Sequence, residues 1–116
     1  MIAVIFEVEP AEGRFDDYLD HAARLKPELE RVPGFISVER FRSLTNPAKV
    51  LSLSFWEDDA AVACWRNHET HRNSQAAGRA GIFAGYRLRV AAVLRDYGMA
   101  ERREQAPEDS LALHGW

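Results

Sequence analysis

Apolar residues open the chain in a pattern typical of a strand that is buried on both faces. One face of the segment 2–9 carries four apolar residues, namely Ile2, Val4, Phe6 and Val8. The opposite face begins with Ala3 and Ile5, so it is apolar as well. Such a strand lies inside a sheet that is covered on both sides. Pro10 and Gly13 follow it and predict its end.

Between residues 13 and 32 the apolar positions recur at steps of three and four, which predicts an amphipathic helix. Its apolar face comprises Phe15, Tyr18, Leu19, Ala22, Leu25 and Leu29. Pro27 cannot donate a helical backbone hydrogen bond, so we expect a kink or break near Leu25 and Lys26. Pro33 and Gly34 then end the helix.

Three more strands and a second helix follow in the pattern. Two strands, at 35–44 and 49–57, are joined by the short turn Thr45-Asn46-Pro47 and therefore form an antiparallel hairpin. Asp58 and Asp59 suit the N-cap and the first turn of a helix over about 59–72. The last strand is expected at 86–97, where Tyr86 begins an alternating apolar face.

This β-α-β-β-α-β order predicts an α+β, ferredoxin-like domain with an antiparallel sheet and both helices on one face. Because the first strand is apolar on both sides, the other sheet face also needs a cover. A second copy of the chain supplies one, which gives a dimeric α/β barrel. Residues 1–97 make up this domain. Residues 98–116 form a C-terminal tail, and its apolar residues could dock on the partner subunit.

Composition narrows the classes of partner. The 116 residues and 47% apolar content fit one globular domain. The 15 basic and 18 acidic residues are interleaved, so nucleic acid is not an expected partner. The longest apolar run is too short to cross a bilayer, so a membrane is not expected either. Met1 leads straight into the first strand, which does not resemble a signal peptide. A single cysteine, Cys64, fits a reducing cytoplasm, and we interpret it as a small core residue.

Candidate chemistry is concentrated in the segment CWRNHETHRNSQ. Trp65, His68 and Arg72 lie on one side of the predicted helix, with His71 adjacent. This group could stack on a planar aromatic ligand and place an imidazole beside a phenolic oxygen. Alternatively, Trp65 anchors the helix on the sheet and the histidines are solvated. No acidic or cysteine partner stands at a ligand spacing from His68 and His71, so no metal site is predicted.

Arginines on the strands are a second group. Arg40 and Arg42 are expected to share a face with Ile36 and Val38, and Arg87 shares one with Arg89. Guanidinium groups facing a cavity could bind a carboxylate or an enolate-like anion. The alternative is that these arginines pair with acids across the sheet, the candidates being Glu7, Glu9 and Glu39.

Taken together, these residues resemble the antibiotic biosynthesis monooxygenase family over about residues 1–97. The resemblance rests on the opening IAVIFEV, the PGF before the second strand, the strand ending in Phe55-Trp56, and the run from Trp65 to His71. It implies a homodimeric barrel with a cavity between sheet and helices. It also implies cofactor-independent oxidation of a phenol, anthrone or quinol, in which the deprotonated substrate passes an electron to O₂.

The resemblance makes Trp65 and His71 the expected catalytic residues. The candidates for contacting the substrate are His68, Arg72, Arg40, Tyr86 and Trp56, although Trp56 also suits a core or an interface.

Two other functions remain open. The neighbouring IsdG-type haem-degrading branch uses an Asn on the first strand, a Trp and a His. Here the first strand has no Asn, and Gln75 stands ten residues after Trp65, so haem as a bound group is the weaker alternative. The chain could also be a non-catalytic small-molecule-binding or structural dimer of the same fold.

Overall fold

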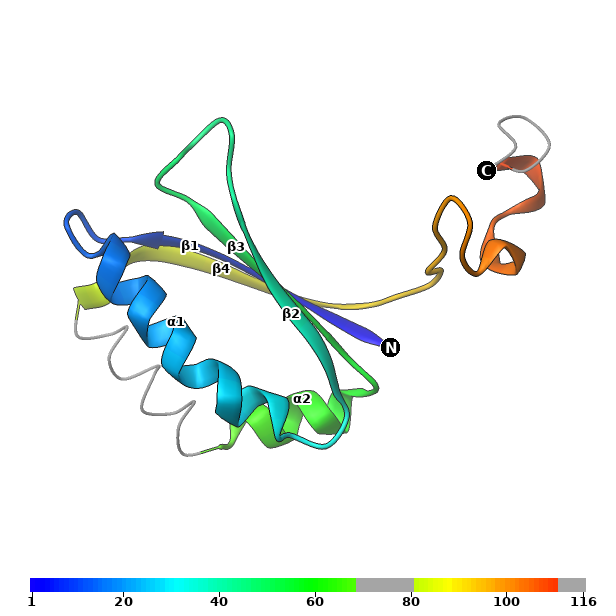
Figure 1. Cartoon of the computed structure of the whole chain (residues 1–116), viewed down its shortest axis with the longest axis horizontal. Helices are drawn as coiled ribbons and strands as arrows, with labels where there is room; N and C mark the ends of the chain where they lie inside the picture. The colour runs from blue at the N-terminus through cyan, green and yellow to red at the C-terminus, as the bar shows by residue number, and fades with distance from the viewer. Residues whose placement is uncertain (69–80, 111–116) are drawn as a thin grey trace.

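The computed structural model describes residues 1–68 and 81–110. Its elements are β1 (Ile2–Pro10), α1 (Phe15–Glu30), β2 (Phe35–Arg42), β3 (Val50–Trp56), α2 (Asp59–Arg66), β4 (Phe83–Ala92) and the short 3₁₀ helix η2 (Arg103–Gln105). The strands form one antiparallel sheet in the order β2-β3-β1-β4 (Figure 1). The predicted ferredoxin-like α+β fold is therefore confirmed for the single chain.

Both helices lie on the same face of the sheet (Figure 1). On α1, Tyr18 packs against Val8 and Val50 of the central strands. Leu29 and the residues of α2 pack around Trp56 at the other end of β3. These contacts reach only the sheet face that carries the even-numbered residues of β1 and β3, so the opposite face has no helix over it.

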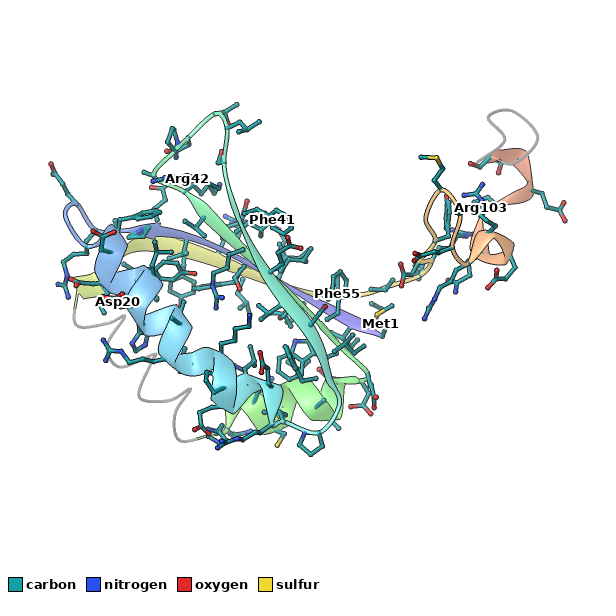
Figure 2. The ribbon with its side chains drawn as sticks, viewed as in Figure 1. Met1, Asp20, Phe41, Arg42, Phe55 and Arg103 are labelled. Atoms are coloured by element: carbon teal, nitrogen blue, oxygen red, sulfur yellow. The ribbon has the colours of Figure 1, made fainter. Side chains whose placement is uncertain are left out.

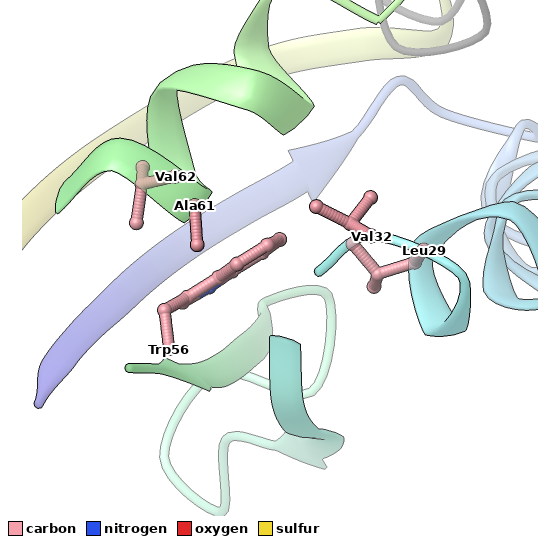
Figure 3. Packing of buried hydrophobic residues seen from close by; sticks show 5 residues of the cluster. All are labelled: Leu29, Val32, Trp56, Ala61 and Val62. Carbon is pink, nitrogen blue, oxygen red and sulfur yellow. The ribbon is translucent and has the colours of Figure 1, made fainter. Parts of the chain in front are cut away.

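Trp56 is the centre of the larger core cluster. Only 1% of its surface is exposed. Its ring is enclosed by a set of apolar side chains from α1, α2 and the turn after α1, which Figure 3 shows: Leu29, Val32, Ala61 and Val62. Phe35 adds an edge-to-face contact at 5.2 Å between ring centroids. The indole Nε1 donates a 2.9 Å hydrogen bond to the hydroxyl of Ser54. Both the apolar and the polar parts of this side chain are thereby satisfied.

Local signals explain how α2 begins and how it approaches the sheet. The Asp58 carboxylate accepts a 2.8 Å hydrogen bond from the backbone N–H of Ala61, which is the predicted N-cap. Gly34, in the turn after α1, has a φ of +88°, a conformation that glycine adopts most easily. A Cβ at Gly34 would lie 2.7 Å from the Cβ of Ala61, so this glycine also lets α2 pack closely.

Several expectations about the helices were wrong. The first helix does not break near Lys26 but continues through Pro27 to Glu30, because burial of Leu29 holds its last turn on the core. Leu19 is 40% exposed, since it lies beside the buried face rather than on it. Cys64 is exposed as well. The buried face of α2 runs through Ala61 and Val62, and Cys64 falls outside it.

The last strand begins and ends earlier than predicted. It spans Phe83–Ala92 rather than 86–97 because its length is set by its partner β1. Ala92 pairs with Ile2 at one end, and Phe83 pairs with Pro10 at the other. The backbone N–H of Val93 makes one further bond to the carbonyl of Met1, and beyond it the first strand offers no partner.

Two register shifts change which side chains face the helices. In β2 the pairing passes from Phe35 directly to Ser37, so that Ile36 pairs with no residue of β3. The expectation that Ile36 shares a face with Arg40 was therefore wrong, and Ile36 is 49% exposed. In β4 a shift opposite Glu9 and Pro10 likewise leaves Ala84 unpaired.

After β4 the chain extends away from the sheet (Figure 1). This segment has interactions of its own. The Arg103 guanidinium donates to the carbonyl of Gly98 at 2.8 Å and lies 5.4 Å from the ring centroid of Tyr97. The end of the predicted docking tail, with Leu111, Leu113 and Trp116, lies outside the described residues. In the part of the chain that the structure describes, no helix is long and apolar enough to span a membrane.

Candidate functional site

A cavity of about 620 Å³ lies between the sheet and the helices. All four strands and both helices contribute to its lining. Side chains of α1 and of the sheet project into the space between them (Figure 2). The chain therefore keeps an open volume beside its core, of a size that small-molecule sites have.

Paired strand residues form the cavity floor as two rows. The first row is Arg40, Ser52, Phe6 and Leu88, and the second is Val38, Ser54, Val4 and Val90. Directly paired residues of antiparallel strands point to the same face of a sheet, and all eight line the cavity. The first row is therefore polar at β2 and β3 and apolar at β1 and β4, and the second row is apolar except at Ser54.

An aromatic cluster forms one end of the cavity. The ring of Phe83 lies 5.9 Å from that of Tyr18 and 6.0 Å from that of Phe6, centroid to centroid. Tyr86, a predicted substrate contact, lies 5.7 Å from Phe6 and also lines the cavity. The register shift in β4 makes this cluster possible, because it turns both Phe83 and Tyr86 toward the helices.

Arg40 is the sheet arginine that enters the cavity. Its Nε is buried and has no hydrogen-bond partner among the described residues. Arg42, by contrast, donates to the carbonyl of Pro47 at 2.7 Å and covers the ring of Phe15. Arg89 pairs with Glu7 at 2.8 Å on the far face of the sheet, as the pairing alternative predicted. The structure thus distinguishes Arg40, which enters the cavity without a partner at Nε among the described residues, from Arg42 and Arg89, which are bonded elsewhere.

Two residues of α1 complete the polar side of the cavity. Burial raises the pKa of the Tyr18 hydroxyl, against the opposing effects of the Arg40 charge and a hydrogen bond from Arg40. Burial, and secondarily the Arg24 charge, lowers the pKa of His21. At neutral pH the phenol therefore keeps its proton, and the imidazole is neutral and able to accept one.

No functional role was predicted from the sequence for Tyr18 or His21. Tyr18 was assigned to the core, and His21 was not singled out. Their spacing was nevertheless a signal, because Tyr18 and His21 lie on one helical face with Ala22 and Leu25. All four residues line the cavity.

Trp65 lines the cavity and packs against the core cluster around Trp56. Its ring stacks on His68 at 5.5 Å with an interplanar angle of 24°, so His68 contacts the cavity wall through this indole. Trp56 also lines the cavity, but its N–H is bonded to Ser54, so it can offer only ring surface. His71 and Arg72, the other predicted members of this group, lie outside the described residues.

Within residues 1–68 and 81–110, no three side chains of His, Cys, Asp or Glu gather as potential metal ligands. Among the described residues, the groups of the cavity lining that can take part in chemistry are two guanidinium groups (Arg40 and Arg66), two phenols (Tyr18 and Tyr86), one imidazole (His21) and a large aromatic surface.

Comparison with known proteins places this geometry in a family. The model of the antibiotic biosynthesis monooxygenase family matches residues 1–77. A Pyricularia oryzae protein named jasmonate monooxygenase ABM is 46% identical over 93 residues, which cover 80% of this chain and 43% of that protein. The chain thus spans less than half the length of this curated relative.

Solved structures show the same fold at low sequence identity. A Deinococcus radiodurans protein described as an antibiotic biosynthesis monooxygenase superposes with a TM-score of 0.77 at 8% identity, covering 84% of this chain and 97% of that one. A MhuD mutant with two manganese protoporphyrin IX molecules bound per active site gives a TM-score of 0.67 at 23% identity, covering 84% and 99%. The match of the family model to residues 1–77 shows that this chain belongs to the antibiotic biosynthesis monooxygenase family.

Proposed function

We propose that the protein is a monooxygenase that oxidises a small, mainly apolar substrate of the phenol, anthrone or quinol type inside this cavity, without a cofactor. The observation that carries the proposal is the cavity of about 620 Å³, walled by Trp56, Trp65 and the aromatic cluster, in a member of a monooxygenase family. Its volume is in the range of small-molecule sites.

The proposed reaction needs little from the protein beyond a controlled environment. In an anthrone, the substrate loses a proton from its activated CH₂, and the carbanion passes one electron to O₂. The two radicals combine to a peroxide, which loses water and leaves a C=O group. One O₂ is consumed, one of its oxygen atoms enters the product, and the other leaves as water. The apolar lining would favour this course by excluding solvent around the anion.

A base must take the first proton. Among the described residues, His21 is the histidine that lines the cavity. Its lowered pKa keeps the imidazole in the proton-accepting form at neutral pH. His71 stays a prediction for the same role. Trp65 would provide the surface on which a planar substrate stacks.

The proposed enzyme is a homodimer. The sheet face opposite the helices carries apolar residues on the two central strands, namely Ala3, Ile5, Leu51, Leu53 and Phe55. In the described chain no helix covers them. Two such sheets pack face to face at about 10 Å, which would remove both apolar faces from water.

Oxygen uptake tests the activity. The purified protein is mixed with hydroxyanthrone, hydroquinone and jasmonate, the last because of the name of the Pyricularia oryzae relative, with chelator and no added cofactor. We expect one O₂ consumed per substrate oxidised. Trp65→Ala, His21→Asn and His71→Ala are each assayed, and loss of the base should lower the rate by about 100-fold or more. Cys64→Ala, an exposed change on the same helix as Trp65, should have no effect.

Other outcomes favour the alternatives. Ligand binding without any oxygen uptake would indicate a binding protein of the same fold. A Soret band that appears on titration with haem and then decays under reducing conditions would indicate a haem-degrading enzyme.

A further inference from the structure

Arg40 is a cation in a cavity whose described lining contains no carboxylate. Among the described residues of the lining, the charged side chains are Arg40 and Arg66, and the remaining polar groups are neutral. The cavity therefore has a positive potential on its described side, and a low dielectric strengthens the field of a charge that protein atoms surround.

The described part of the chain leaves the hydrogen bonds and the charge of Arg40 incompletely satisfied. Within the described residues it makes no ion pair, although Glu7 on the other face of the sheet pairs with both Lys49 and Arg89. Its Nε is buried from solvent without an acceptor. The Tyr18 hydroxyl is the partner that the structure gives it, and this neutral group does not compensate the charge. A buried donor without an acceptor and a cation without an anion are both unfavourable, and an anionic ligand would relieve both.

The position of Arg40 also gives the ligand a direction. Ser52 pairs with Arg40 across the β2–β3 ladder, and Tyr18 approaches the same guanidinium from α1. The row then continues through Phe6 to Leu88, which are apolar. A ligand that fits this row has one polar end at β2 and an apolar body over β1 and β4.

We propose that Arg40, together with Tyr18 and Ser52, binds the carboxylate group of a substrate whose apolar body lies against Phe6 and Leu88. The planar guanidinium matches a carboxylate, which can accept two of its N–H groups at once. Tyr18 accepts a hydrogen bond from Arg40 and keeps its own O–H free to donate to the ligand. That the bound carboxylate belongs to a substrate rests on the proposed function, but a binding experiment alone can test the carboxylate site.

Calorimetric titration compares 1-naphthylacetate with 1-naphthylacetamide, which has the same ring system and no charge. The protein should bind the carboxylate about tenfold or more tightly than the amide, as charge-assisted hydrogen bonds predict. Arg40→Gln should lose about tenfold to a hundredfold in carboxylate affinity and keep its amide affinity. Tyr18→Phe should show a smaller loss in the same direction. Arg42→Gln, two residues along the strand and bonded to Pro47, is the matched control and should bind like the unmodified protein.

Equal affinity for the carboxylate and the amide, or an unchanged carboxylate affinity in Arg40→Gln, would overturn the inference. A tighter complex with 2-naphthol than with 1-naphthylacetate would also overturn it, because the cavity would then recognise a phenol. Should Arg40→Gln not fold by circular dichroism, the preference of the unmodified protein and the loss in Tyr18→Phe decide the question.

The inference and the proposed function fail separately. Carboxylate binding that depends on Arg40, without oxygen uptake on any substrate, would support the carboxylate site and contradict the proposed monooxygenase activity. Oxygen uptake with Arg40→Gln at the unmodified rate on acidic and neutral substrates alike would do the reverse.

Discussion

The indole N–H of Trp56 is bonded to the hydroxyl of Ser54, two residues earlier on the same strand, at 2.9 Å. Both residues are buried, at 1% and 7% exposure. Residues two apart on a strand point to the same face, so this bond closes within one strand. The bond satisfies the indole N–H of Trp56 within the core, without a contact to solvent or to a ligand in the cavity.

Replacing Ser54 with Ala should destabilise the fold by about 1–3 kcal/mol, because the buried N–H of Trp56 would lose its acceptor. Urea unfolding measures the change. Glu30→Ala, at the exposed end of α1, is the control and should stay within about 0.5 kcal/mol of the parent. A Ser54→Ala protein as stable as this control would mean that the bond contributes nothing net.

Comparing substitutions at Gly34 and Gly13 distinguishes the cost of backbone strain from the cost of steric crowding. Both have positive φ, at +88° and +76°, but only the Cβ at Gly34 would meet a neighbour within 4 Å. Gly13→Ala should cost about 1–2 kcal/mol for the left-handed backbone. Gly34→Ala should cost about 1–3 kcal/mol more, because its methyl would push against Ala61 and displace α2. Thermal or urea unfolding of the two variants provides the comparison, and equal losses would show that α2 moves without resistance.

The apolar sheet face predicts the oligomeric state. Leu53 lies at the centre of this face, paired with Ile5 on one side and Glu39 on the other. Sedimentation of the parent protein at micromolar concentration should show a dimer, and Leu53→Glu should show a monomer, because a buried unpaired charge is costly. Leu19→Glu places the same charge at an exposed position of α1 and should leave the dimer intact. A parent protein that sediments as a monomer would contradict the packing of two sheets.

His21 should make stability depend on pH in a defined window. Its folded pKa lies below the ordinary value of 6.5, so the unfolded chain takes up a proton first as the pH falls. The free energy of unfolding should therefore decrease as the pH falls from about 6.5 toward the lowered pKa, and His21 should have no such effect above that window. His21→Gln should lose this part of the pH dependence. Urea midpoints at pH 7.5 and 5.5 test it, and parallel curves for both proteins would count against the shift.

Much of the fold could be predicted from the spacing of apolar residues, because the side chains that form the core recur at the periods of a strand and of a helix. The even residues of β1 and the N-cap at Asp58 were identified correctly from the sequence. The end of the last strand was not, since the apolar pattern continues through Leu94 while the partner strand does not. A strand's limits depend on its neighbour in space, and this information is absent from the strand's own residues.

The candidate site was predicted in part for a similar reason. Trp65, Tyr86 and Arg40 were identified by residue type, and all three line the cavity. The separation of Arg40 from Arg42 depends on contacts with Tyr18, Phe15 and Pro47, which no local pattern contains. His21 was overlooked because the face of this helix was identified from its apolar residues alone, although His21 lies at helical spacing with Tyr18 and Leu25.

The unpaired Ile36 determines the sign of the charge inside this molecule. In an uninterrupted ladder starting from Phe35, Glu39 would stand opposite Ser52, and Arg40 would turn to the outer face. A sheet of this sequence in which Ile36 paired with Phe55 would offer its ligand an acid where this chain offers a base, and it would select amines instead of acids. Ligand preference in such a sheet can therefore invert through a register change of one residue, with no change in the amino-acid sequence of the strand.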